Sequence, residues 1–77
     1  MKKMYVVYVS YNDAQDPDAW VCTSRKKAEE KFRSYLKENM EDGVDDDGHT
    51  IAECVEQWYA RIDWYQEVRI VEASMEK

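Results

Sequence analysis

Apolar residues follow two different periods along this chain, and each period predicts a different kind of element. Segment 4–11, MYVVYVSY, is rich in Val and Tyr, which fit the pleated, half-buried surface of a strand. Both faces of this strand are apolar, as expected for a central strand or for one covered on both sides, and a second subunit is one way to cover it. The two faces carry Met4, Val6 and Tyr8, and Tyr5, Val7, Val9 and Tyr11.

A turn and a second strand come next, followed by the clearest helix of the chain. Segment 12–18 has the Asn, Asp and Pro content of a turn, and AWVCT at 19–23 reads as a strand. Ser24 or Thr23 is placed to cap a helix by accepting from its free N–H groups, and Gly43 is a natural stop. Apolar side chains recur at helical spacing between charged ones, at Ala28, Phe32, Tyr35, Leu36 and Met40.

A second helix and a last strand complete the pattern. Thr50 and Glu53 fit a capping box, in which each side chain bonds to the backbone N–H of the other residue. A helical apolar stripe follows at Ile51, Val55, Trp58 and Ile62. Segment 64–73 alternates instead, which predicts a strand, and the tail 74–77 is expected to fray. The two faces of that strand are Trp64, Val68 and Ile70, and Tyr65, Val71 and Ala73.

The order strand, strand, helix, helix, strand predicts an α+β fold with helices packed on one face of a three-stranded, mostly antiparallel sheet. A chain of 77 residues has room for a single domain, residues 1–77. Hydrophobic residues make up 44% of it, which is enough for a core. The 36% of charged residues therefore indicates a wetted surface and not disorder.

The charge of the chain is negative and unevenly distributed. A net charge of -6 repels nucleic acid and anionic membranes, so we expect neither as a direct partner. Residues 24–37 hold six basic and two acidic side chains, whereas residues 38–72 hold eleven acidic side chains and only Arg61 and Arg69 as basic ones. This distribution predicts one basic patch and a larger acidic one.

The cysteines and the N-terminus favour a soluble protein of the cytoplasm. Cys22 and Cys54 are far apart within apolar patterns, which is typical of buried free thiols and not of a disulfide-stapled secreted miniprotein. The apolar run that follows the N-terminal lysines spans only residues 4–9 and lacks a small-residue cleavage site. We therefore expect neither a signal peptide nor a membrane span.

The acidic segment (residues 40–50), MEDGVDDDGHT, has the alternate carboxylates of a calcium loop but not its spacing. A loop that starts at Asp45 has Thr50 at the sixth position, where the sharp turn requires glycine. Shifting the frame so that Gly48 is sixth removes the acidic ligands from the first and last positions. We therefore interpret the segment as a solvated connector and predict no bound metal.

Other cofactor and catalytic chemistry is also poorly represented. Zinc needs four ligands, usually at paired close spacings, and the chain has one histidine, His49, and no C-x-x-C pair. Cys54, five residues after His49, does not share a helical face with it, so the two do not form a nucleophile and base. Phosphate-binding glycine motifs are absent from the sequence. We predict a non-enzymatic protein that needs no cofactor.

The aromatic residues are numerous for so small a chain, with three Trp, six Tyr and one Phe. Phe32 and Trp58 lie on helical apolar stripes and are expected in the core. A small sheet with one helical layer cannot bury all the others, and exposed tyrosine is favoured at interfaces. The candidate aromatic anchors are Tyr11, Tyr59 and Tyr65.

The chain resembles a known group of proteins in three stretches, which are the opening YVVYVSY, the hairpin into WVCTSRKKAEEKF and the closing YQEVRIVEA. Together they resemble small uncharacterised proteins of phages and mobile elements, which open on a Val/Tyr strand and continue with a second strand and a Ser- or Thr-capped helix. Those proteins also end on a strand. The resemblance covers about two thirds of the chain, implies a genomic context, and supplies no functional residues.

These observations favour a protein-binding module, in its most specific form an acidic inhibitor or regulator of the phage type that mimics nucleic acid. Its carboxylates would occupy the Lys and Arg side chains with which a partner, such as a host defence enzyme, normally holds phosphates. The predicted acidic patch comprises Glu41, Asp42, Asp45, Asp46, Asp47, Glu53 and Glu56. The alternative is a structural domain that forms a homodimer through its apolar sheet face, with the charge serving only solubility.

Overall fold

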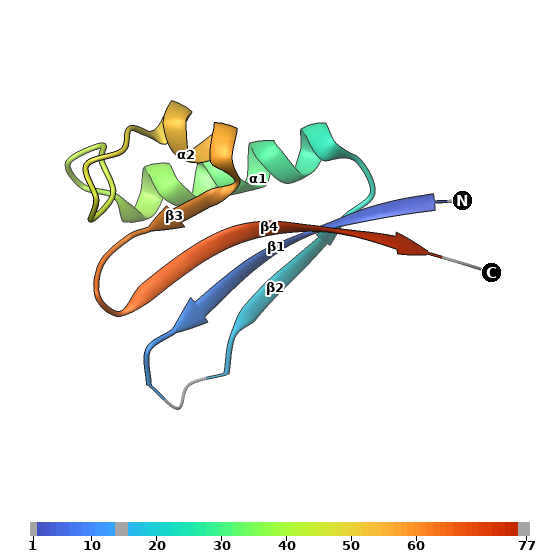
Figure 1. Cartoon of the computed structure of the whole chain (residues 1–77), viewed down its shortest axis with the longest axis horizontal. Coiled ribbons are helices and arrows are strands. Elements are labelled where there is room, and N and C mark those ends of the chain that lie inside the picture. The colour runs from blue at the N-terminus through green and yellow to red at the C-terminus, as the bar shows by residue number, and fades with distance from the viewer. Residues whose placement is uncertain (1, 14–15, 76–77) are drawn as a thin grey trace.

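The computed structural model describes residues 2–13 and 16–75 and places two helices on one face of an antiparallel sheet (Figure 1). Its elements are β1 (Lys2–Tyr11), β2 (Asp18–Cys22), α1 (Arg25–Asn39), α2 (Ile51–Gln57), β3 (Tyr59–Arg61) and β4 (Gln66–Met75). The sheet order is β2-β1-β4-β3, so the two long strands lie in the centre and the two short ones form the edges. The predicted α+β fold is confirmed, and the described sheet has four strands where three were predicted.

The core lies between the helices and the two central strands. In the register of β1 with β4, Val7 lies opposite Ile70 and Val9 opposite Val68, and all four side chains are buried. Because side chains alternate along a strand, these residues share one face of the sheet. The predicted faces of segment 4–11 are therefore confirmed, and the helices cover the face with the larger set of residues.

Helix α1 forms as its apolar spacing predicts. Ser24 is the N-cap, and its hydroxyl accepts from the backbone N–H of Lys27 at 3.1 Å. Phe32 and Leu36 are fully buried, as is Ala28 one turn earlier. With 15 residues, α1 is the longest helix that the structure describes, and no helix in residues 2–13 and 16–75 is long and apolar enough to cross a membrane.

Helix α2 begins with the predicted capping box but ends earlier than its apolar stripe predicts. The Thr50 hydroxyl accepts from Glu53 N, and the Glu53 carboxylate accepts from Thr50 N. The helix stops at Gln57 because Trp58 adopts a left-handed conformation with φ 57°. The prediction of a helix as far as Ile62 was therefore wrong, since the chain turns back to form β3.

Tertiary contacts of Trp58 account for that early stop. Its indole N–H donates to the Glu29 carboxylate on α1 at 2.8 Å, its ring meets Tyr5 edge-on, and the Arg25 guanidinium lies over its face. A left-handed conformation costs about 1–3 kcal/mol in a residue other than glycine, and these contacts offset the cost. The reversal places Ala60, fully buried, opposite Val68 of β4.

Strand β4 begins two residues later than predicted and runs further. The Asp63 carboxylate accepts from the backbone N–H groups of Tyr65 and Gln66, at 2.8 and 2.9 Å, and closes a turn between β3 and β4. That turn takes Trp64 out of the strand, so the prediction that it shares a face with Val68 and Ile70 was wrong. Residues 74 and 75, predicted to fray, belong to β4, and residues 76–77 lie outside the described residues.

Candidate functional site

The acidic segment is organised around one buried carboxylate, that of Asp45. Its side chain is fully shielded from solvent, and Oδ1 accepts from the backbone N–H groups of Asp47 and His49 at 2.9 and 2.8 Å. The Oδ2 atom accepts a hydrogen bond from the backbone N–H of Arg61 on β3 at 3.5 Å and another from the thiol of Cys54 on α2 at 3.6 Å. Asp45 therefore ties the segment to a helix and to a strand at once.

Hydrogen bonding outweighs burial in setting the charge of Asp45. Burial alone would raise its pKa, but the backbone N–H groups of His49, Arg61 and Asp47 stabilise the carboxylate and hold the pKa below its ordinary value. The group is therefore an ionised acceptor at neutral pH. Its role in the segment is structural, and it is not available to a partner at the surface.

The inclusion of Asp45 in the exposed acidic patch was therefore wrong, and so was the interpretation of the segment as only a solvated connector. A bridge between Val44 and Thr50 and a bond from Gly48 N to the Asp45 carbonyl add further order. The left-handed φ of Gly48, +86°, is one that glycine adopts without strain. The exposed acidic residues that remain are Glu41, Asp42, Asp46, Asp47, Glu53 and Glu56.

Three of the side chains in this region approach one another closely enough to be considered as metal ligands. One ligand atom from each of Asp45, Asp47 and His49 lies within 4.8 Å of the others. Both oxygens of Asp45 already accept hydrogen bonds within the protein. The arrangement is thus explained by the turn that it forms.

The acidic segment also covers the edge of the sheet at β3. The backbone N–H of Asp46 donates to the Arg61 carbonyl at 2.7 Å, while the Arg61 N–H points to the Asp45 carboxylate. The segment therefore contacts both backbone groups of Arg61, and the exposed side chain of Asp46 is held beside β3. Figure 1 shows the segment and the turn between β3 and β4 at the same end of the molecule.

The turn between β3 and β4 presents an exposed indole beside a shallow pocket. Trp64 has 73% of its surface exposed, and its ring meets that of Tyr65 at 5.6 Å between centroids. Tyr65 in turn packs against Tyr11 at 5.5 Å. The pocket is lined by Ser10, Tyr11, Asn12, Arg61, Trp64, Tyr65 and Glu67.

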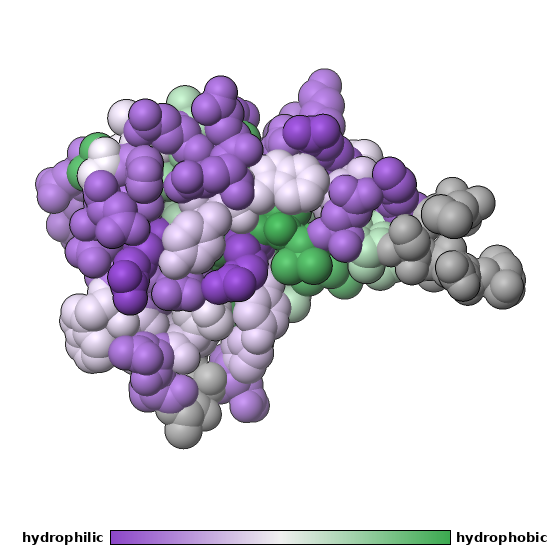
Figure 2. All heavy atoms as spheres, viewed as in Figure 1, coloured by the Kyte–Doolittle hydropathy of each residue, from purple (hydrophilic) through white to green (hydrophobic). Residues whose placement is uncertain are grey.

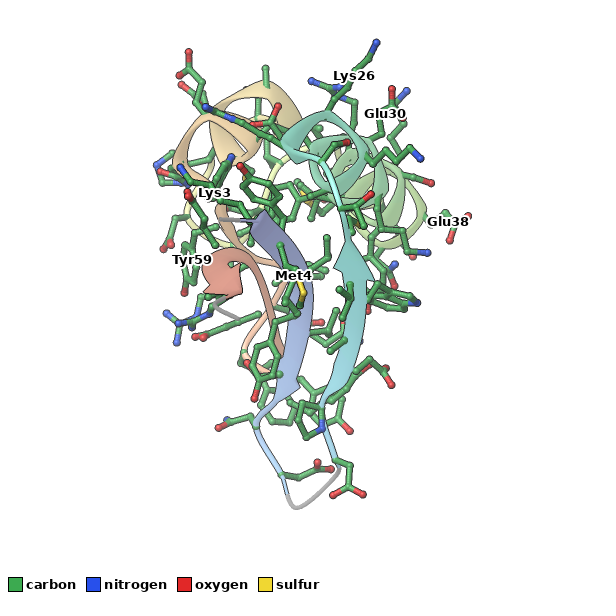
Figure 3. All side chains as sticks on the ribbon, turned by 90° about the vertical axis from the view of Figure 1, so that its right-hand side faces the viewer. Lys3, Met4, Lys26, Glu30, Glu38 and Tyr59 are labelled. Carbon is green, nitrogen blue, oxygen red and sulfur yellow. The ribbon has the colours of Figure 1, made fainter. Side chains whose placement is uncertain are left out.

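The three tyrosines predicted as anchors are half-buried and engaged within the molecule. The hydroxyl of Tyr11 donates to Asp18 at 2.7 Å, which raises the pKa of Tyr11, and that of Tyr65 donates to Asp13 at 3.0 Å. Tyr59 extends from the side of the sheet away from α1 (Figure 3), with the Arg69 guanidinium over its ring. Trp64 is the more accessible aromatic side chain, and it was not predicted as an anchor because it fits the alternation of the last strand.

No helix of the described residues lies on the second face of the sheet, and we call it the helix-free face. Strand pairing sets Val21, Val6 and Val71 side by side across β2, β1 and β4, with Val21 62% and Val71 45% exposed. Figure 2 shows a hydrophobic area over β4 and β1 with hydrophilic side chains around it. This face is the apolar one on which the homodimer alternative was based.

Cys54 lies in an environment that keeps its thiol protonated. Both cysteines are free thiols, and Cys54 is fully buried. Burial, together with the nearby charge of Asp45, raises the pKa of Cys54 to about 12, so the group is a protonated donor at neutral pH.

No protein-family model, curated protein or solved structure matches this chain.

Proposed function

We propose that this chain is a non-catalytic protein-binding module that presents a fixed acidic surface to a basic partner. The observation that supports it is the buried Asp45 carboxylate, which orders the acidic segment by accepting from its backbone. Exposed carboxylates on an ordered segment lose less conformational freedom on binding than the same groups on a mobile loop. The residues presented from this segment are Glu41, Asp42, Asp46 and Asp47.

Trp64 is the proposed anchor of this surface. It is exposed, and it lines a pocket together with Arg61, the residue whose carbonyl bonds to Asp46 of the acidic segment. Tryptophan is enriched among the residues that dominate binding energy, usually within a polar surround. The carboxylates would then supply attraction and orientation, and the indole would supply buried apolar area.

The partner that we propose is a protein whose Lys and Arg side chains normally hold phosphates. Carboxylates arrayed on a rigid surface form charge-assisted hydrogen bonds with the same groups, so the mode of action is competition with nucleic acid. Inhibition of a host defence enzyme by a phage-type protein is the most specific form of this proposal. The net charge of -6 also speeds the encounter with such a partner at low ionic strength.

The test is affinity capture from the native host, followed by release with duplex DNA. Asp46→Lys combined with Asp47→Lys is expected to abolish capture, because it reverses two charges at the centre of the proposed surface. Glu30→Lys combined with Glu38→Lys is the matched control, since it makes the same charge change on exposed positions of α1 (Figure 3). Capture that survives the first variant, or that both variants abolish equally, would refute the proposal.

A further inference from the structure

The two edges of the sheet differ in what covers them. At β3, the acidic segment contacts both backbone groups of Arg61. At β2, the described residues pair with β1 alone, and no backbone hydrogen bond leads outward from Asp18–Cys22. The outward N–H and C=O groups of β2 therefore form an open edge that can accept another strand.

Strand β2 also lacks the features that usually protect an edge. Its register with β1 is continuous from Asp18 to Cys22, without a bulge, and Pro17 lies outside the strand. The only charge within β2 is that of Asp18 at one end. Val21 is 62% exposed near its centre, where a protected edge commonly carries lysine.

We propose that β2 pairs with β2 of a second copy of this chain, antiparallel, about a two-fold axis near Trp20. The ladder would set Ala19 opposite Val21 of the second copy, and the two four-stranded sheets would become one continuous sheet. This interface does not involve the acidic segment and is independent of the partner proposed above.

Charge complementarity between the two ends of β2 supports a second copy as the occupant. In an antiparallel pair the start of one strand lies beside the end of the other. Asp16 and Asp18 mark the start of β2, while Lys27 lies just past its end, with its backbone N–H bonded to the Ser24 hydroxyl. Asp16 lies opposite Ser24 of the second copy in this register, and so beside Lys27 of that copy.

The placement of α1 puts Lys27 on the correct side for this contact. The Lys31 ammonium lies 4.5 Å from the Trp20 ring centroid, so this face of α1 overhangs β2. Lys27 lies one turn earlier on the same face. Among the ion pairs of the described residues, none involves Asp16 or Lys27, so both are available to the second copy.

The helices leave room for such a pair. In the joined sheet, three strand spacings separate β1 from its counterpart, which is about 14 Å. Packed helices need only about 8–10 Å between their axes. Helix α1 packs on β1, with smaller contacts to its neighbours, so the two copies of α1 would not overlap.

The experiment is sedimentation velocity over a concentration series with reciprocal charge reversals. The native chain, of 9.2 kDa, is expected to form a species of twice that mass as its concentration rises to about 1 mM. Asp16→Lys alone and Lys27→Glu alone should each raise the dissociation constant roughly tenfold, because each variant places like charges together at both symmetric contacts. An equimolar mixture of the two variants should recover association, since opposite charges then meet at both contacts.

Recovery in the mixture also shows that both variants are folded, so loss of structure cannot imitate the result. Asp46→Lys serves as the control for net charge, and it should leave the native association unchanged. A native chain that stays monomeric throughout would overturn the proposal. So would a dimer that both single variants retain, or a mixture that associates no better than either variant alone.

Discussion

The two edges of this sheet differ in whether another segment of the chain bonds to the outward backbone groups of the edge strand. At β3, a three-residue strand is covered by the acidic segment, whose Asp46 N–H and Asp45 carboxylate meet the backbone of Arg61. At β2, five residues with an exposed valine have no such cover in the described part of the chain. Within the described residues, a charged loop therefore closes one edge as part of the fold, whereas the outward backbone groups of the other edge stay open to solvent.

The largest effect is expected from removing the Asp45 carboxylate, which helps to cover the edge at β3. Asp45→Ala leaves the backbone N–H groups of Asp47 and His49 without their acceptor and releases the contact with Arg61. We expect the free energy of unfolding to fall by about 3 kcal/mol, measured by urea denaturation. Asp47→Ala, at an exposed position, is the control and should change it by less than about 0.5 kcal/mol. Equal effects of the two variants would contradict the role given to Asp45.

The pH dependence of the free energy of unfolding tests the same contribution of Asp45, with a smaller expected effect. The pKa of Asp45 is lower in the folded chain than its ordinary value of 3.8, so its contribution is fully present above that pH. The contribution is lost as the pH falls through the folded-state pKa. Unfolding measured from about pH 7 to about pH 2 should show a steeper acid loss for the native chain than for Asp45→Asn. Identical slopes would indicate that other carboxylates dominate acid unfolding.

A lysine at the open edge should have the smallest effect on folding and a selective effect on association. Val21→Lys is expected to change the free energy of unfolding by less than about 0.5 kcal/mol, because Val21 is largely exposed. It should nevertheless weaken the proposed self-association, which light scattering would measure. Val71→Lys makes the same change on the helix-free face of a central strand. If both variants weaken association equally, the helix-free face and not the edge is the contact.

The sequence predicts the elements whose signals are local. The Ser24 cap, the apolar stripe of α1 and the Thr50 and Glu53 capping box depend on residues within a few positions of one another, and the structure confirms each. The faces of β1 are predicted equally well, because alternation and burial give the same answer there.

The features that the sequence does not predict depend on contacts between distant residues. Trp58 fits a helical stripe, but its bond to Glu29, 29 positions away, accompanies the left-handed turn that starts β3. In the sequence Asp45 is indistinguishable from its acidic neighbours, and only the folded chain places Cys54 and Arg61 against it. Trp64 fits an alternating strand, and the Asp63 turn that exposes it has a local signal, an aspartate followed two and three residues later by the N–H groups that it binds.

The position of Asp45 also determines how the molecule opens in its native state. Its carboxylate joins the acidic segment, α2 and β3, so no one of these can separate without disturbing the other two. Segments joined in this way open as a cooperative unit, with a free energy below that of global unfolding. The amide protons of Asp47, His49 and Arg61 should therefore exchange with solvent at a common rate, while those at the centres of β1 and β4 exchange more slowly.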